Sequence, residues 1–489
     1  MAISLLHTTA SSPHMADKRL IYHLSLDRTM AYICADTPKR QHFLDHLCVP
    51  VIDRETIEYR QDILHDFIRY PQLLHDLISL FSRFRDLRTA QKNAGKDDYH
   101  LHLTQTASDA SAKNILQAQA LCLKRALHFV EHFAELLTSR PLRAKGLTDF
   151  RDTCQTYCEN PAFHALVTAC SKYETFSTNG FLDFQFTLDA EGRIAHYALI
   201  DHRHIRITDS DLKKKGLPFF KKAEPSHPCT RVYPTQNSFW GDLTITALSD
   251  LSKLLATICQ EIFAQFSPID RELEIYETAL QYVYALTERN IPFCFPQIST
   301  TPAMTVADLY DLHLVMTSPS ASHVVPHDLS LSASAAGAVV FGQNGSGKTV
   351  FLRAVGTMQL LTQVGLPVPC TQAKLPLYTQ IAAQFSEAEK EFCAGNDAGR
   401  FEQEVRELAR MADTLQAGAL VLLNETFQST AYAEGAQSLF DLLEYFSACR
   451  IRWILVSHLR QLEHMLGTNQ ATILHTTNGY QITQSSPTK

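Results

Sequence analysis

The chain has 489 residues, of which 45% are apolar and 19% are charged. Because a single hydrophobic core rarely grows beyond about 250–300 residues, this length predicts a globular protein with more than one domain. A formal net charge of −7 excludes a polycationic protein, so any contact with nucleic acid must come from a local basic patch.

The sequence also argues against membrane and secreted proteins. No apolar run approaches the roughly 20 residues of a membrane helix, and the N-terminus lacks the basic region of a signal peptide. The twelve cysteines are scattered without a C-x-x-C pair. These features predict a reduced, cytoplasmic protein with no membrane contact and no zinc site.

The N-terminal part of the chain has helical periodicity after a short polar segment. Residues 1–18 are small and polar, and we expect them to be disordered. Asp53 can cap a helix whose apolar side includes Ile57, Leu64 and Phe67. The pattern is typical of a helix that packs its apolar side against a core.

Helical spacing then continues in three stretches, residues 71–87, 115–137 and 147–171. The polar residues 91–113 interrupt this pattern, and we predict a loop between two helices there. Together these stretches predict a helical core domain over residues 19–178.

The period changes from helical to alternating near Gly180. Apolar and other residues alternate over 181–188 and again over 194–200, with a turn between the two runs, which predicts a β-hairpin. Helical spacing returns at Asp242. We therefore predict a β-rich insertion over residues 179–236 and long helices over residues 237–295.

The predicted insertion carries a dense group of lysines within ten residues. Such a group is most often a solvated surface, but it is also the composition of a phosphate-binding patch. The group consists of Lys213, Lys214, Lys215, Lys221 and Lys222.

Three prolines, Pro292, Pro296 and Pro302, mark a linker before the last part of the chain. From Ala307 onward, short apolar strands alternate with helices, which predicts a mainly parallel sheet. The predicted fold class is thus all-α with a small β insertion, followed by an α/β domain over residues 296–489.

The α/β part contains the phosphate-loop pattern G-x-x-x-x-G-K-[ST] between an apolar strand and a proline-free helix. Its glycines let successive backbone N–H groups point at one anion. Lys348 would reach the β- and γ-phosphates, and the Thr349 hydroxyl would hold Mg²⁺. The eight predicted nucleotide-binding residues are Gly342, Gln343, Asn344, Gly345, Ser346, Gly347, Lys348 and Thr349.

Two later strands supply candidates for the rest of this site. The apolar run 418–423 ends in Asn424 and Glu425, which we place on a strand neighbouring the one before the phosphate loop. Glu425 would orient or deprotonate the attacking water. The candidate ligands of Mg²⁺ are Thr349, Asn424 and Glu425, of which Asn424 brings no charge to the metal. The run 453–456 ends in Ser457 and His458, and His458 would sense the γ-phosphate.

The order G-x-N-x-x-G-K-T, then N-E, then S-H resembles the ATPase domain of the MutS family, an ABC-type fold. Further segments carry the same resemblance, which covers about residues 40–476. They are Pro50-Val-Ile-Asp-Arg-Glu-Thr-Ile-Glu-Tyr-Arg60, Gly365-Leu-Pro-Val-Pro369, Gly399-Arg-Phe-Glu-Gln-Glu404 and Asn424-Glu-Thr-Phe-Gln-Ser-Thr430.

The resemblance implies a MutS-like ATPase that uses ATP and Mg²⁺ at composite sites of an ATP-dependent homodimer. Gly399 and Arg400 would close over the ATP of the partner, although Gly399 replaces a serine of the family pattern. The β insertion stands at the clamp position of the family, so its lysines would meet the phosphates of double-stranded DNA, in DNA repair or recombination.

Several departures from the family pattern argue against mismatch recognition itself. No segment before Arg40 resembles the mismatch-recognition domain, and none before Lys489 resembles the C-terminal helix-turn-helix or the Smr nuclease domain of a paralogue branch. Val324 stands near the position of the adenine-stacking aromatic. We expect a weak dimer without nucleotide.

Three alternatives remain open from the sequence. The chain is either a MutS-like ATPase acting on DNA, a ribosome- or RNA-associated relative of the Smr-bearing paralogues, or a nucleotide-gated binding protein with very slow hydrolysis. A phosphotransferase with a phosphate loop is disfavoured, because Glu425 and the segment from Gly399 suit hydrolysis across a dimer.

Overall fold

The computed structural model describes eleven segments of the chain, and by internal contacts they divide into two units. The first, named the helical unit, comprises His75–Leu142 and Thr148–Asp270. The second, named the sheet unit, comprises Ser4–Leu74, Arg143–Leu147 and Arg271–Lys489. The described residues are 4–7, 18–103, 109–174, 180–188, 194–204, 229–232, 239–385, 400–427, 432–466, 471–477 and 480–484.

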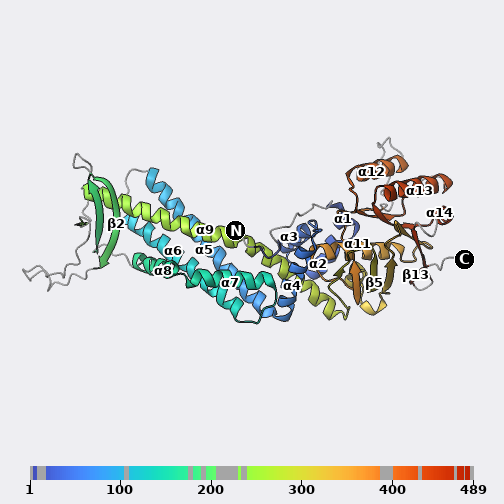
Figure 1. Cartoon of the computed structure of the whole chain (residues 1–489), viewed down its shortest axis with the longest axis horizontal. Helices are drawn as coiled ribbons and strands as arrows, with labels where there is room; N and C mark the ends of the chain where they lie inside the picture. The colour runs from blue at the N-terminus through green and yellow to red at the C-terminus, as the bar shows by residue number, and fades with distance from the viewer. Residues whose placement is uncertain are drawn as a thin grey trace, which may run out of the picture. The chain divides into compact units, whose positions relative to one another are not determined.

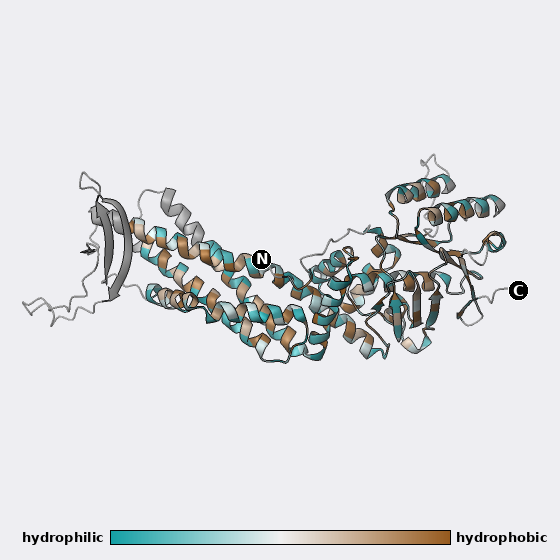
Figure 2. Cartoon of the chain, in the orientation of Figure 1, coloured by the Kyte–Doolittle hydropathy of each residue, from teal (hydrophilic) through white to brown (hydrophobic). Residues whose placement is uncertain are grey.

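Long helices build the helical unit (Figure 1), and Figure 2 shows apolar and polar residues interspersed along them, as in amphipathic helices. Its core holds a cluster of phenylalanines, among them Phe84 and Phe129 with tilted rings whose centroids are 4.4 Å apart, and Phe133 and Phe266 edge to face at 5.6 Å. The helices that contribute to it are α5 (Pro71–Leu103), α6 (Asp109–Thr138), α7 (Lys145–Glu159), α8 (Pro161–Glu174) and α9 (Phe239–Glu288).

The loop predicted over residues 91–113 is wrong for most of its length. Helix α5 continues to Leu103, and α6 already begins at Asp109, so both helices extend into the polar stretch. The reason is that polar side chains mark the exposed side of a helix as readily as a loop. At the ends of the stretch, Gln91 and Ala112 are buried, as residues on the inner side of a helix are.

The predicted hairpin is confirmed. Strand β1 (Gly180–Leu188) pairs antiparallel with β2 (Ile194–His204), and β3 (Cys229–Val232) pairs with the other edge of β1. The sheet order is therefore β2-β1-β3. The five lysines between β2 and β3 lie outside the described residues.

The sheet unit contains the predicted mainly parallel sheet, with strand order β13-β12-β7-β11-β10-β9. All its neighbouring strands run parallel except β12 and β13. A second, four-stranded sheet has the order β4-β8-β5-β6. The chain thus joins a helical N-terminal region to an α/β part, as the sequence predicts.

The bounds of these strands follow. The six-stranded sheet consists of β7 (Gly337–Phe341), β9 (Ile381–Phe385), β10 (Leu420–Asn424), β11 (Arg452–Ser457), β12 (Ala471–Thr476) and β13 (Ile482–Gln484). The four-stranded sheet consists of β4 (Gln297–Ile298), β5 (Met304–Leu309), β6 (His327–Leu331) and β8 (Gln372–Leu375).

Helices from both ends of the chain accompany these sheets. Trp453, Phe446 and Leu439 belong to an apolar core between β10, β11 and α13. The helices are α1 (Arg19–His23), α2 (Leu26–Ile33), α3 (Thr37–Leu47), α4 (Arg54–Arg69), α10 (Leu312–Thr317), α11 (Lys348–Val364), α12 (Arg400–Thr414), α13 (Tyr432–Ala448) and α14 (Gln461–Met465), with a 3₁₀ turn over Ala321–His323.

The N-terminal residues Ser4–His7 are packed into the sheet unit, where the sequence predicted disorder. Leu5 and Leu6 are buried. The Glu272 carboxylate accepts hydrogen bonds from the Ser4 hydroxyl at 2.5 Å and from the Leu5 amide at 2.6 Å. Burial raises the pKa of Glu272 above its ordinary value, although these two hydrogen bonds oppose the shift.

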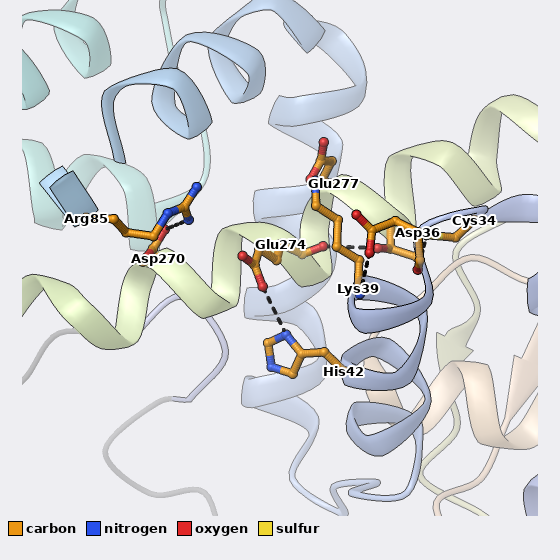
Figure 3. A network of polar contacts seen from close by, with 9 residues as sticks. Cys34, Asp36, Lys39, His42, Arg85, Asp270, Glu274 and Glu277 are labelled. Atoms are coloured by element: carbon orange, nitrogen blue, oxygen red, sulfur yellow. Dashed lines mark hydrogen bonds and ion pairs between the residues drawn. The ribbon is translucent and has the colours of Figure 1, made fainter. Parts of the chain in front are cut away.

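An ion pair and a histidine–carboxylate contact join helix α3 to the later part of α9 within the sheet unit (Figure 3). Lys39 Nζ lies 2.5 Å from Glu277 Oε2, and His42 Nδ1 lies 3.5 Å from Glu274 Oε2. The helical unit has its own pair along α9, in which Arg85 donates to Asp270 at 2.7 Å. Helix α9 therefore contributes to both units: its residues up to Asp270 belong to the helical unit, and its residues from Arg271 belong to the sheet unit.

Among the helices that the structure describes, none is both long enough and apolar enough to cross a membrane.

Asp53 caps the N-terminal end of α4, as the sequence predicts. The Asp53 carboxylate accepts hydrogen bonds from the Thr56 hydroxyl at 2.6 Å and amide at 2.8 Å. Asp53→Ala should therefore lower the free energy of unfolding by about 1 kcal/mol at pH 7. The measurement is chemical denaturation between pH 3.5 and pH 7.

The pH dependence has a defined sign. Hydrogen bonds from the Thr56 side chain and backbone hold the pKa of Asp53 below its ordinary value. Ionised Asp53 thus stabilises the folded state above the unfolded pKa, and this contribution is lost as pH falls through the folded pKa. The difference between parent and Ala variant should shrink below about pH 4. Asp53→Asn, which keeps an acceptor without the charge, is the control, and an equal difference at both pH extremes would contradict the prediction.

Candidate functional site

The phosphate-loop residues lie at the end of a buried central strand and open a helix. Strand β7 is buried at every residue, and α11 begins at Lys348 directly after the loop. Gly345 and Gly347 have φ values of 78° and 88°, in the left-handed region that favours glycine. These two glycines therefore allow the tight turn that leads from β7 into α11, whose first N–H groups have no partner within the helix and can bind an anion.

Gly342 is required by a close approach. A Cβ atom at this position would lie 1.8 Å from Thr476 Oγ1, at the end of β12. That hydroxyl donates a hydrogen bond of 2.7 Å to Ser346 Oγ. Thr476 thus supports the loop from the next strand. Thr476 was not predicted from the sequence, because a threonine at a strand end has no distinguishing signal.

Lys348 is the buried cation of the site. It is 3% exposed, and its Nζ donates to the carbonyl oxygens of Gly342 at 3.0 Å and of Gln343 at 2.8 Å. Glu425 Oε1 lies 3.5 Å from the same nitrogen. Lys348 is thus held at the loop by two neutral acceptors and one carboxylate.

Asn424 and Glu425 meet the phosphate loop although their strand is not the neighbour of β7. Strand β11 lies between β7 and β10, so the predicted adjacency is wrong. Neighbouring strands are about 4.8 Å apart, and two such steps separate β7 from β10. The contact is made from α11 instead, where the Thr349 hydroxyl donates to Asn424 Oδ1 at 3.0 Å.

The backbone after β10 turns sharply. Glu425 and Phe427 have φ values of 52° and 63°, which are unusual for residues other than glycine. The Glu425 amide donates to the Val456 carbonyl at 2.9 Å, and the Phe427 amide donates to Glu404 Oε2 at 3.1 Å. Glu404 is buried on α12, so this helix supports the turn that presents Glu425.

Glu404 is a second residue of the site that was not singled out. The signal that could have found it is its place at the last position of the segment Gly399–Glu404, which resembles a signature of the MutS family. A buried carboxylate three to four residues inside a helix, paired with a backbone amide elsewhere, is a positioning group and not a surface charge.

The remaining predicted residues are placed less completely. His458 follows β11, which brings it to the same edge of the sheet as Asn424, and Ser457 Oγ accepts from the Leu459 amide at 3.1 Å. Arg400 begins α12, but its side chain and Gly399 lie outside the described residues. Val324 is buried.

The donor set fits a nucleotide with a divalent cation. The Thr349 hydroxyl and the Asn424 amide oxygen are hard oxygen ligands of the kind that Mg²⁺ accepts, and they already lie in contact. The start of α11 and the Lys348 ammonium provide positive charge beside them. Residues 343 to 349 and Asn424 therefore suit a phosphate group and its metal ion. Glu425 lies beside them, in contact with Lys348.

Comparisons with known proteins agree with this arrangement. Residues 338–483 match the family described as MutS domain V, and residues 52–289 match the MutS2 N-terminal domain.

Several curated relatives are named DNA mismatch repair protein MutS. The protein of Microcystis aeruginosa is 29% identical over 254 residues, covering 50% of this chain and 28% of that protein. The protein of Petrotoga mobilis is 22% identical over 458 residues, covering 86% of this chain and 52% of that protein. The protein of Rhodopirellula baltica is 22% identical over 462 residues, covering 89% of this chain and 50% of that protein. The chain thus spans about half or less of these relatives.

Nucleotide affinity should depend on Lys348. Lys348→Ala removes an ammonium group from a partly dry loop, and charge-assisted hydrogen bonds contribute about 1.5–3 kcal/mol each. We expect ATP binding to weaken by at least about 10-fold in isothermal titration calorimetry. Lys374→Ala, at an exposed lysine of β8, is the matched control. Unchanged affinity in the Lys348 variant would remove the nucleotide assignment.

Proposed function

Because the chain belongs to the MutS family, with a MutS domain V and a MutS2-type N-terminal domain, we propose that it is a cytoplasmic ATPase that couples ATP binding and hydrolysis to nucleic-acid binding. The observation that supports this proposal best is that two residues at the start of α11, Lys348 and Thr349, contact Glu425 and Asn424 after β10. Thr349 contacts Asn424 at 3.0 Å, and Lys348 lies 3.5 Å from Glu425.

Binding of ATP would draw on groups that the loop already presents. The N–H groups at the start of α11 would donate to the phosphate oxygens, as at other helix N-termini. Lys348 would exchange the carbonyl oxygens of Gly342 and Gln343 for the β- and γ-phosphates. Thr349 and Asn424 would hold Mg²⁺, which neutralises phosphate charge when bound. Because Asn424 is neutral, the site brings one negative charge fewer to the metal than an aspartate would.

Hydrolysis would use Glu425 as the group that orients the attacking water and accepts its proton. The hydrogen bond from its amide to Val456 and the turn braced by Glu404 fix its backbone. Movement of Lys348 toward the phosphates would free the Glu425 carboxylate from its ion-pair partner. His458 would lie near the γ-phosphate as a polar contact at the end of β11.

The proposal includes an ATP-dependent homodimer with composite sites. The support is the family membership and the position of α12, whose first residue, Arg400, follows the signature-like Gly399. In this arrangement the two residues would approach the ATP of the partner copy. Two rival proposals keep the same nucleotide site. In one, ATP is hydrolysed very slowly and its binding only switches the binding of a partner on or off; in the other, the ATPase acts on RNA and ribosomes.

The proposal that the chain binds nucleic acid is supported by the match of residues 52–289 to the MutS2 N-terminal domain and by the group of five lysines over residues 213–222. DNA repair or recombination would be the setting if the ligand is double-stranded DNA. Mismatch repair is the role in the names of the three relatives given above, and the part of each relative that this chain matches is at most about half of that relative's length.

Turnover should depend on Glu425 while ATP binding should not. Glu425→Gln keeps the size of the side chain but removes the proton acceptor, and loss of such a base typically costs about 10²–10⁴-fold in rate. Phosphate release should fall by at least about 100-fold, and light scattering should detect a dimer that accumulates with ATP. Glu407→Gln, at a carboxylate of α12, is the control. Parental turnover in the Glu425 variant would reject the catalytic role.

The lysine group should bind phosphates without reading sequence. If Lys213, Lys214, Lys215, Lys221 and Lys222 all meet duplex phosphates, replacing all five with alanine should reduce the log–log salt slope of binding by about 4 units, from about 0.9 per phosphate. Fluorescence anisotropy with duplex DNA, duplex RNA and ribosomes would measure this slope and also separate DNA from RNA partners. Equal slopes and affinities would show that the lysines are only a solvated surface.

A further inference from the structure

Two cysteines of the sheet unit, 76 positions apart in sequence, lie with their sulfur atoms in contact. Cys294 Sγ and Cys370 Sγ are 3.4 Å apart, and both are free thiols. Disulfide formation requires an S–S distance of about 2.05 Å, so an approach of about 1.4 Å would close the bond. Cys294 is partly exposed and Cys370 is buried, so a small oxidant can reach one member of the pair.

The backbone holds this pair in place. The Cys294 amide donates to the Val368 carbonyl at 3.0 Å, and the Val368 amide donates back to the Cys294 carbonyl at 2.9 Å. The Cys370 amide donates to the same Val368 carbonyl at 2.8 Å. The two sulfur atoms therefore meet because the two segments are paired, and not because two mobile side chains happen to touch.

Disulfide formation needs one thiol that attacks the oxidant and a second thiol that reacts with the oxidised first one, and the two cysteines differ in a way that suits these two roles. A hydrogen bond with the Cys370 thiol lowers the pKa of Cys294, whereas that bond and burial raise the pKa of Cys370. The thiolate is the form of cysteine that attacks an oxidant. The thiol with the lower pKa is thus also the less buried one, Cys294, and the buried thiol of Cys370 is in place to react with the oxidised Cys294.

We propose that Cys294 and Cys370 are a redox modification site, at which a peroxide converts the two thiols into a disulfide that small thiols reduce again. The Cys294 thiolate attacks one oxygen of hydrogen peroxide and the O–O bond breaks, which leaves a sulfenic acid and a hydroxide; the proton released by the Cys294 thiol converts this hydroxide into one water. The Cys370 sulfur then attacks the sulfenic sulfur and forms the S–S bond, and the displaced hydroxide takes the Cys370 thiol proton and leaves as a second water. In total the two thiols lose two protons and two electrons, and one hydrogen peroxide becomes two waters.

The disulfide would join the segments that follow two helices of the site's unit. Cys294 lies between the end of α9 at Glu288 and β4, and Cys370 lies between α11 and β8. A hydrogen bond of 3.0 Å from the Tyr282 hydroxyl on α9 to the Pro367 carbonyl already connects these segments. A covalent tie there would restrict movement of the far end of α11, whose first turn holds Lys348 and Thr349. Resting on the proposed ATPase function, this predicts slower turnover in the oxidised form.

A second pair of thiols provides an internal control. Cys122 Sγ and Cys259 Sγ lie 3.7 Å apart between α6 and α9 of the helical unit, and both residues are buried. The distance is similar to that of the first pair, but no member is exposed to an oxidant. Accessibility, and not sulfur–sulfur proximity alone, should therefore decide which pair reacts.

The test treats the full-length chain with hydrogen peroxide, blocks free thiols by alkylation and identifies linked peptides by mass spectrometry. We expect a Cys294–Cys370 peptide that forms at least about 10-fold faster than a Cys122–Cys259 peptide and disappears with a thiol reductant. Cys294→Ser and Cys370→Ala should abolish it, and Cys122→Ser should not. Absence of this peptide in the parent chain, or equal rates for the two pairs, would overturn the proposal.

The effect on turnover is measured on the same samples. ATP hydrolysis should fall several-fold in the oxidised parent and recover on reduction, while Cys294→Ser should be insensitive to peroxide. A fully linked parent with unchanged turnover would overturn the regulatory role and leave the modification site standing. No hydrolysis even in the reduced parent would contradict the proposed function, because the linked peptide is detected independently of it.

Discussion

The burial of α11 is the constraint on which the sheet unit depends. This helix must start at the phosphate loop, where Lys348 and Thr349 are needed, yet almost every residue that follows is buried. It contacts β9, β10 and β11 as well as α3, α4 and α10. A helix enclosed in this way cannot leave its polar side chains to water, so most of their polar atoms require hydrogen-bond partners within the protein.

The polar residues of α11 show how this requirement is met. Gln363 donates to the carbonyls of Val51 and Tyr378 at 3.2 and 2.9 Å, and the Val51 amide donates back to the Gln363 carbonyl. Near the start of the helix, Arg353 makes two hydrogen bonds with the buried Asp311, which also caps α10. The bonds between Gln363 and Val51 hold the N-terminal segment in the same unit as the sheet, although 312 positions separate the two residues in sequence.

The end of α11 extends this network to the N-terminus and to α9. Arg60 donates to the carbonyls of Val364 and Leu6, and a Cβ atom at Gly365 would approach the Arg60 side chain to 2.7 Å. Leu5 in turn donates to Glu272 of α9 and accepts from the Tyr276 hydroxyl at 2.7 Å. A continuous set of hydrogen bonds therefore runs from the helix that begins at Lys348 to the later part of α9.

Local signals determined much of this protein from sequence alone. The phosphate loop, the Asn424–Glu425 pair, the β-hairpin and the α/β pattern were all recognisable, because each depends on spacings of a few residues. Only the tertiary structure placed β11 between β7 and β10, bonded Ser4 and Leu5 to Glu272, and brought Thr476, Glu404 and the cysteine pair to their partners. These features depend on which distant segments become neighbours. That choice follows from burying α11 and satisfying its polar groups, and no periodicity within a single segment records it.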